Sequence, residues 1–428
     1  MSNLNRLYKG YWWLPAFPAD QVAGTLTIDS NGNVKLELFG CFGNKDEQFD
    51  FEIDDESAIF GRCYDPKSNM TDVSLLYCRS AYTMNFSSSF PITKYSCRYA
   101  LMGIHIESID SASFFKANVD FNELVYWCPP TNIITSVSKQ EISVRIKTAE
   151  NEETTKATVS LDDGTTLRIK EAASYIPNYS SVNLGQTTYL EIQKDNINVE
   201  QVLVITKSFE RFMSLATLSS VEHIKIVLYS KQIYQELREG TLFYHPIEMV
   251  VSLYKNSSDA WANDVTKYLF EYKDVAAEFG NMFKKLYEDN QIAQIFNNLL
   301  ASLEKKRVYT SNDFLIVAQA LDGFAMRFRE EKNLLNEYTG LRNEFKDIKK
   351  LNLTDKDLKV AVGSRHYYSH ILKLEKKDVK QAADGVKLYD LTKKLRVLLI
   401  CCVLNFMGLS NERINQLLNK CNHIMLHD

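Results

Sequence analysis

The feature that most constrains the fold is a change of hydrophobic period near residue 199. Before this point, short segments alternate apolar and polar residues, as in Gly24–Ile28 and Val34–Gly40, which flank an Asn31-Gly32 pair. Such alternation is typical of strands with one buried face, and Asn-Gly between two strands favours a hairpin turn. We expect further strands at Phe49–Ile53, Ser74–Tyr77, Tyr99–Ile106, Phe114–Val119, Ile142–Thr148, Thr158–Leu161, Thr166–Lys170 and Thr187–Gln193. These segments predict a β-sandwich or a barrel-like domain.

Beyond that point the apolar residues recur at helical spacing. They predict a helix at about 199–217, then a strand at His223–Tyr229, then helices from about Lys267 onward. Breaks near 311–313, 352–354, 383–385 and 408–411 divide this last part into about five helices. We therefore expect an α+β multidomain protein of 428 residues, with a β-rich domain over residues 1–265 and an all-helical bundle over residues 266–428.

The charge distribution is uneven along the chain. A net charge of −4 gives no global signature of nucleic-acid binding, but Arg342–Arg396 holds 15 Lys and Arg against 8 Asp and Glu. Such a segment forms either solvated helix faces or a surface that attracts phosphate groups. Both interpretations stay open at this point.

Several features indicate a protein of the cytoplasm. The N-terminus lacks the pattern of a signal peptide, and the most apolar run, Val397–Leu409, is shorter than the roughly 20 residues of a membrane-spanning helix. Eight cysteines are scattered without a Cys-x-x-Cys pair, which favours buried, reduced thiols over a zinc site. We expect no membrane contact, no metal and no cofactor.

The candidate chemistry lies on a helix that begins near Thr354, which can cap it ahead of Asp355 and Asp357. Its later turns carry Arg365 and His370. Cleavage of RNA without a metal needs proton transfer near neutral pH, which histidine provides, and fixed positive charge on the phosphate, which arginine provides. The two residues lie about 140° apart around the helix, a gap that the long arginine side chain can cover.

Neighbouring polar residues extend this cluster. His366 shares a helix face with His370, and Ser369 shares one with Arg365. One Arg and one His per chain fall short of an acid, a base and two phosphate contacts. A homodimer would double the set, because a two-fold axis brings the same patch of both chains together.

The spacing of Arg and His alone is not specific, since Arg98 with His105 and Arg238 with His245 are similarly spaced in strand-like or loop-like sequence. Arg365 and His370 could also be an ordinary polar helix face, and His366 with His370 could be a metal-ligand pair, although no third ligand is evident. On the preceding helix, Asp322 and Arg327 could orient the site or form a surface ion pair.

Several segments resemble the ApeA family of bacterial anti-phage HEPN proteins. Gly10–Pro15, with Gly24–Leu26 and the Asn31-Gly32 turn, is similar to the start of the ApeA N-terminal domain. Leu269–Val275 and Phe314–Phe324 are similar to the entry into the family's helical domain, and Arg365–His370 matches the Arg-x(4 to 6)-His signature of HEPN ribonucleases.

This resemblance implies a metal-independent endoribonuclease that cleaves RNA when phage infection is sensed, which arrests the host by abortive infection. The resemblance also implies that Arg365 and His370 are catalytic residues and that the β-rich domain is the sensor of a phage-derived trigger. We expect His366 to assist these two residues, in a homodimer formed through the HEPN domain. Two residues depart from the family pattern: His366 stands where Asn or Asp often follows the arginine, and Asp322 stands where the preceding helix often has Glu. The alternatives are a non-catalytic HEPN-like dimerisation or binding module and a metal-dependent hydrolase.

Overall fold

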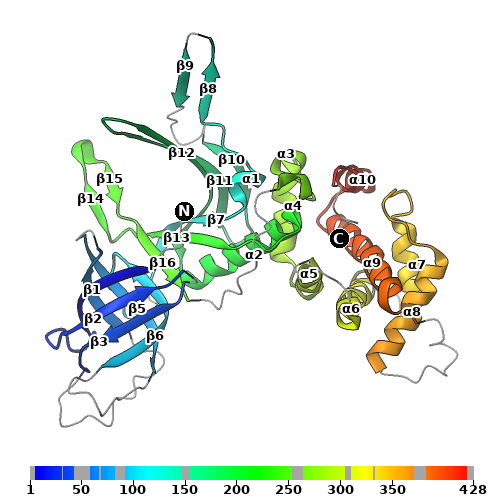
Figure 1. The fold of residues 1–428 in the computed structure, drawn as a ribbon, viewed down its shortest axis with the longest axis horizontal. Coiled ribbons are helices and arrows are strands. Elements are labelled where there is room, and N and C mark those ends of the chain that lie inside the picture. The colour runs from blue at the N-terminus through cyan, green and yellow to red at the C-terminus, as the bar shows by residue number, and fades with distance from the viewer. Residues whose placement is uncertain are drawn as a thin grey trace.

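The structure is a computed structural model. It describes residues 5–30, 32–42, 58–66, 69–81, 92–110, 112–139, 141–146, 154–252, 264–303, 310–330, 333–370 and 382–421. Its β-rich part and its helical part lie next to each other, in chain order (Figure 1). The predicted strand Phe49–Ile53 and the turn residue Asn31 lie outside the described residues.

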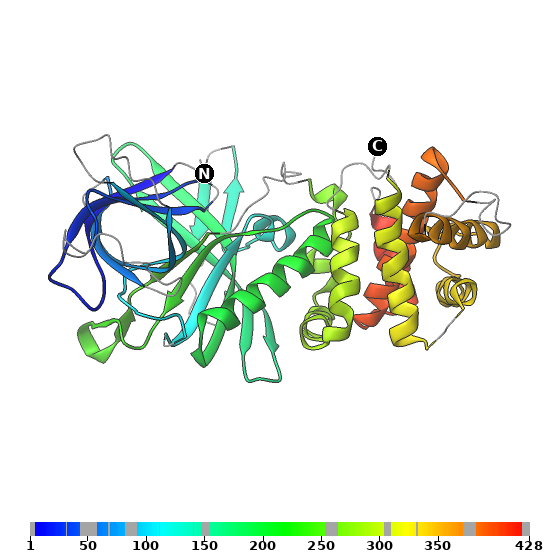
Figure 2. The ribbon, with the colours of Figure 1, turned by 90° about the horizontal axis from the view of Figure 1, so that it is seen from below.

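The first six strands close into an antiparallel barrel, which Figure 2 shows nearly end-on. The barrel closes because β6 pairs with β3 on one side and with β5 on the other. This confirms the barrel-like alternative of the predicted fold. The strands are β1 (Arg6–Trp13), β2 (Val22–Ile28), β3 (Val34–Leu38), β4 (Ile59–Tyr64), β5 (Met70–Ala81) and β6 (Thr93–Met102).

The barrel interior is filled by alternate side chains of its strands, among them Trp12, Leu26, Leu36 and Leu75. Trp12 is fully buried, and a Cβ on Gly61 would lie 2.2 Å from its ring atom Cε3. Only glycine therefore fits at this point of β4.

An open antiparallel sheet continues from the barrel, because β16 pairs with the last residues of β6. Its order from the free edge is β10-β11-β12-β7-β13-β16. The strands are β7 (Phe114–Phe121), β10 (Thr155–Ser160), β11 (Thr166–Pro177), β12 (Val182–Ile197), β13 (His223–Tyr229) and β16 (Ile247–Val251). Two hairpins, β8 (Ile133–Val137) with β9 (Ile142–Ile146) and β14 (Tyr234–Glu236) with β15 (Leu242–Tyr244), stand beside this sheet.

Two helices cover one face of the open sheet: α1 (Leu124–Trp127) and α2 (Val199–Thr217). The predicted helix 199–217 is confirmed. The side chain of Asn198 accepts a hydrogen bond from the Gln201 amide, and the Gln201 side chain accepts one from the Asn198 amide. This reciprocal cap stops the strand β12 and starts the helix.

The helical part contains more helices than the sequence suggested. Eight α-helices follow residue 270 in the described residues, not about five: α3 (Tyr272–Val275), α4 (Phe279–Glu288), α5 (Asn290–Leu303), α6 (Ser311–Phe328), α7 (Leu334–Glu344), α8 (Asp355–His370), α9 (Gly385–Phe406) and α10 (Asn411–Lys420). The predicted breaks are confirmed, but those before α4, α5 and α7 contain neither Gly nor Pro and were missed. Short 3₁₀ turns span Arg238–Gly240 and Val265–Lys267.

One apolar core runs from the open sheet into the helices. At the junction, Trp127 is fully buried, and its indole nitrogen donates to the Phe270 carbonyl at 3.0 Å. The same ring packs against Phe212 of α2 and Phe279 of α4, with centroids 5.9 Å away in both cases. The two parts therefore share their packing rather than meeting only at a linker.

The predicted state of the cysteines is confirmed, since all eight are free and seven of them are buried. Val397–Leu409 lies largely in the buried helix α9, as expected. Among the described helices, none combines the length and the hydropathy that a membrane-spanning segment requires.

Candidate functional site

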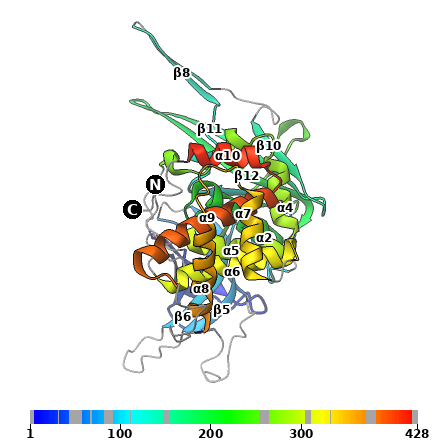
Figure 3. The ribbon, with the colours of Figure 1, turned by 90° about the vertical axis from the view of Figure 1, so that its right-hand side faces the viewer.

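The site is built on α8, which packs against α6 and α7 at the helical end of the molecule (Figure 3). Its start follows the predicted cap: Thr354 Oγ1 accepts from the Asp357 amide at 3.2 Å, and Asp357 Oδ2 accepts from the Thr354 amide at 2.9 Å. Asp355 pairs with Arg342 at 2.8 Å, and Asp357 pairs with Lys394 of α9 at 3.1 Å. Burial raises the pKa of Asp357, but these donors outweigh it and leave the pKa below its usual value.

The later turns of α8 are held against the segment that precedes α9. Ser364 is fully buried, and its hydroxyl accepts from the Ala383 amide at 2.9 Å and donates to the Val360 carbonyl at 2.7 Å. One turn on, the Tyr368 hydroxyl donates to the Ala383 carbonyl at 2.8 Å. These bonds fix the rotation of the helix that presents Arg365 and His370.

Arg365 reaches across to α6, where its Nε donates to Asp322 Oδ2 at 2.9 Å. The arginine side chain is 27% exposed and the aspartate side chain 10%. Among the described residues, the two Nη groups of Arg365 make no further hydrogen bond. The ion pair therefore fixes the guanidinium and leaves its outer donors able to bind an anion.

Asp322 lies in a largely buried environment, which raises the pKa of its carboxyl. The nearby Tyr338 hydroxyl, Arg365 and His366 all favour the charged form, but burial outweighs them. Burial also raises the pKa of Tyr338, with the Asp322 charge as a further cause. Tyr338 is fully buried on α7, so the site joins three helices.

The two histidines of the segment are more accessible than the ion pair. His366 is half-buried and His370, the last residue of α8, is exposed together with Ser369. The rings of His366 and His370 are nearly parallel, with their centroids 6.3 Å apart. A continuous polar strip thus runs from Asp322 through Arg365 and His366 to His370.

Arg327 is not part of this strip. Its Nη1 donates to the Gln291 carbonyl on α5, close to the end of α6. The surface ion pair that the sequence suggested between Asp322 and Arg327 is wrong, because Asp322 pairs with Arg365 instead. The contact between α6 and α8 spans 43 residues of sequence and leaves no pattern in either helix alone.

The other Arg and His pairs of similar spacing have different surroundings. The guanidinium of Arg98 lies 5.3 Å from the Tyr99 ring centroid, and His105 Nε2 lies 3.0 Å from the Gly61 carbonyl oxygen, with the imidazole stacked on Phe60. Arg238 and His245 belong to the small hairpin of β14 and β15. Of these three pairs, only Arg365 and His370 share one helix.

Sequence reasoning missed Tyr338, Ser364 and Tyr368 as supports of the site. Their role depends on contacts with Asp322 and Ala383 that no spacing within one helix reveals. Over the residues that the structure describes, no group of three or more His, Cys, Asp or Glu is placed to hold a metal ion.

Comparison with known families adds to this geometry. The model of ApeA N-terminal domain 1 matches residues 7–286, and the model of the Apea-like HEPN domain matches residues 315–413. No curated protein and no solved structure matches the chain. The polar strip lies within the second matched range, and the first range alone covers more than half of the chain. The chain therefore belongs to the ApeA family, with ApeA N-terminal domain 1 followed by an ApeA-like HEPN domain.

Proposed function

We propose that this protein is a metal-independent endoribonuclease that cleaves RNA in the bacterial cytoplasm during phage infection. The observation that carries the proposal is the pairing of Arg365 with Asp322, which leaves the Nη groups of the guanidinium without a partner in the described residues. The exposed His370 follows five residues later on the same helix. Membership in a family with an Apea-like HEPN domain supports the same activity.

The reaction proposed is attack of a ribose 2′-OH on the adjacent phosphorus. The bond from O2′ to phosphorus forms, and the bond from phosphorus to O5′ breaks, which yields a 2′,3′-cyclic phosphate and a free 5′-OH. A base takes the 2′-OH proton, and an acid delivers a proton to O5′. We assign one of these proton transfers to His370, with His366 as its neighbour and Arg365 as the group that stabilises the charged phosphorane.

Two chains would complete the site. A single chain presents one exposed His370 and one Arg365, whereas the reaction uses both an acid and a base. A second copy related by a two-fold axis would add the same two groups across the interface. We therefore propose a homodimer through the HEPN domain, with the reaction at the shared surface.

Exposed cations on the first half of α8 suit an RNA backbone. Lys356 and Lys359 on α8 are exposed, while the acidic residues of the first turn are already paired with Arg342 and Lys394. Phosphate groups approaching α8 would thus meet more free positive than negative charge. In this proposal Arg327 has no catalytic role, and Ser369, which is exposed next to His370, contacts the RNA.

The biological role proposed is abortive infection. RNA cleavage would arrest the infected host, and the β-rich part would hold the enzyme silent until it binds a phage-derived trigger. We expect such control because an unregulated ribonuclease would cleave the RNA of its own cell.

The test is cleavage of total bacterial RNA by the purified protein in EDTA, with His370→Ala and Arg365→Ala as variants. We expect wild type to leave cyclic phosphate ends and each variant to lose at least about a hundredfold in rate. Arg238→Ala and His245→Ala are matched controls, because these residues have a similar spacing but are exposed on the β14 and β15 hairpin.

Cleavage that survives in His370→Ala, or that needs a divalent cation, would contradict the proposal. If purified wild type is silent, the same set of variants is compared in phage-infected cells. A non-catalytic dimerisation module would protect cells equally well with and without Arg365 and His370.

A further inference from the structure

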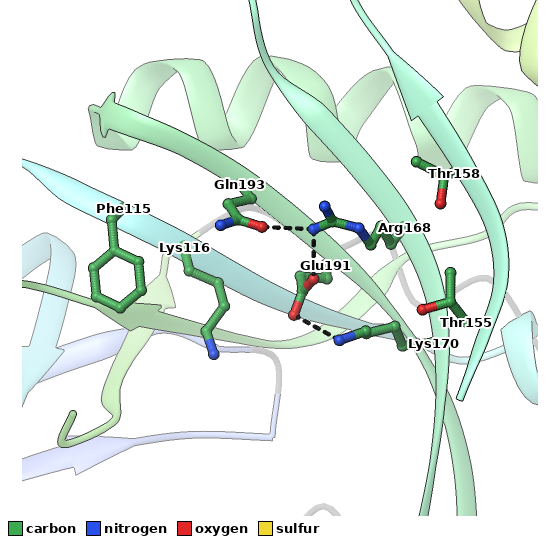
Figure 4. Close-up of a pocket in the computed structure, with 8 residues that line it drawn as sticks. All are labelled: Phe115, Lys116, Thr155, Thr158, Arg168, Lys170, Glu191 and Gln193. Atoms are coloured by element: carbon green, nitrogen blue, oxygen red, sulfur yellow. Dashed lines mark hydrogen bonds and ion pairs between the residues drawn. The ribbon is translucent and has the colours of Figure 1, made fainter. Parts of the chain in front are cut away.

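A cavity of about 690 Å³ lies on the open sheet, away from the residues of α8. Figure 4 shows its lining, which comes from β7, β10, β11 and β12. The core side chains of these strands, such as Ile169 and Ile192, pack on the helix-covered face of the sheet. The charged residues alternate with them and so point to the opposite face. The lining residues are Phe115, Lys116, Thr155, Thr158, Arg168, Lys170, Glu191 and Gln193.

The pairing of the strands brings the charged residues together. Arg168 stands opposite Glu191 on the neighbouring strand, and Lys116 stands opposite Gln193. Arg168 Nη1 lies 3.1 Å from Glu191 Oε1, and Lys170 Nζ lies 3.5 Å from Glu191 Oε2. Two of the three cations in the lining thus pair with its one carboxylate, and the three cations and one carboxylate give the lining a net charge of +2.

Lys116 has the least compensation of the three cations. In the part of the chain that the structure describes, its ammonium forms no ion pair and lies 4.2 Å from the centroid of the Tyr229 ring. Burial lowers the pKa of Lys116, so the charged ammonium is costly where it lies. An anion in the cavity would remove this cost.

We infer that this sheet cavity binds a phosphate-bearing small molecule of the nucleotide class. Lys116, Arg168 and Lys170 would hold the phosphate groups, because ammonium and guanidinium groups form charge-assisted bonds with phosphate oxygens. The hydroxyls of Thr155 and Thr158 line the same space, and the Phe115 ring offers an apolar surface on which a base can stack. The volume lies within the usual range for small-molecule sites. The inference is independent of the nuclease chemistry, since no residue of α8 takes part.

The experiment is calorimetric titration of the full-length protein with the four ribonucleoside triphosphates, with inorganic tripolyphosphate and with a short single-stranded RNA. We expect at least one nucleotide to bind more tightly than tripolyphosphate. Lys116→Met should weaken that binding about tenfold or more, because the substitution removes a charge and keeps the chain length. Glu191→Gln should tighten it, because the variant raises the net charge of the lining.

Lys194→Met is the matched control, since Lys194 lies on β12 but pairs with Asp163 outside the lining. The melting temperature of each variant without ligand separates loss of binding from loss of folding. Failure of every nucleotide to bind would overturn the inference, and so would variants of Lys116 and Glu191 that bind like wild type. Equal affinity for tripolyphosphate would overturn the nucleotide assignment, and binding of single-stranded RNA alone would overturn the small-molecule assignment.

Discussion

The carboxylate of Asp322 on α6 and the guanidinium of Arg365 on α8 form an ion pair, with Oδ2 and Nε 2.9 Å apart. The pair uses one edge of the guanidinium, and the buried Tyr338 of α7 lies close to it, with its hydroxyl donating to the Ala318 carbonyl at 3.3 Å. In the proposed mechanism Asp322 is thus a positioning residue, which would act on a substrate only through Arg365.

Replacing Asp322 tests this positioning role. We expect Asp322→Asn to lower kcat for RNA cleavage about ten- to a hundredfold with little change in KM, because Arg365 would remain present but loosely oriented. The measurement is steady-state kinetics on a defined RNA, with Asp347→Asn, an exposed aspartate, as the control. A variant with unchanged kcat would show that the ion pair only stabilises the fold.

The proposed shared site predicts how the RNA cleavage activity changes when wild-type chains are mixed with inactive chains. Inactive His370→Ala chains added to wild type and exchanged into dimers should reduce activity as the square of the wild-type fraction. An equal mixture would keep about a quarter of the activity, whereas independent sites would keep about half. Cleavage rates measured across a series of mixing ratios distinguish the shared site from independent sites. Chains with His245→Ala are the control, because this substitution lies outside the site and should not lower the rate.

The pairing of Glu210 with His223 predicts a pH dependence of stability. Glu210 is buried on α2, and its Oε1 lies 2.6 Å from His223 Nδ1 on β13. Burial raises the pKa of Glu210, but His223 and Lys207 outweigh it and hold the pKa below its ordinary value of 4.5. A lowered carboxyl pKa contributes stability that is complete above 4.5 and is lost as pH falls through the lowered value.

We therefore expect the melting temperature of wild type to fall more steeply than that of Glu210→Gln as the pH is lowered from about 5 to about 3. At neutral pH the same variant should cost roughly 1–3 kcal/mol in the free energy of unfolding. Glu200→Gln, on the same helix but exposed, is the control. Parallel pH profiles for Glu210→Gln and wild type would refute this prediction.

The burial of Trp127 predicts that the junction between the β-rich and helical parts contributes strongly to the free energy of unfolding. Trp127 is fully buried among Phe212, Tyr272 and Phe279. Trp127→Ala should destabilise the protein by about 3–5 kcal/mol, through lost apolar contact and a cavity. Differential scanning calorimetry checks this, with the partly exposed Tyr126→Ala as the comparison. A loss below about 1 kcal/mol would mean that the junction carries little packing energy.

Local sequence patterns predicted the parts of the fold that depend on one element at a time. Alternation predicted β2, β3 and β12, apolar residues at helical spacing predicted α2, and the cap at Thr354 marked the start of α8. The strand predicted at Tyr99–Ile106 ends early, at Met102, because Gly103 takes a positive φ of 109°. The strands β1, β4 and β16 were missed, although β16 joins the barrel to the open sheet.

The candidate site was predictable where its residues are neighbours in sequence, as in Arg365, His366 and His370. Asp322 was expected either to orient the site or to pair with Arg327, and the sequence could not decide between these because its contact with Arg365 depends on how α6 and α8 pack. The sheet cavity could not be predicted either, since Lys116 and Gln193 meet only through the pairing of β7 with β12. The domain boundary at residues 265 and 266 stays a prediction, and the N-terminal family model extends past it to residue 286.

The shared core at Trp127 also bears on how the chain can be divided. The helical part contributes Phe270, Phe279 and Phe283, which bury their rings against α2 and the tryptophan. A fragment that begins at residue 266 would expose these aromatic rings to water and would tend to aggregate. During synthesis the β-rich part emerges first and supplies the surface on which these later residues settle. We therefore expect the helical part to need the β-rich part in order to fold.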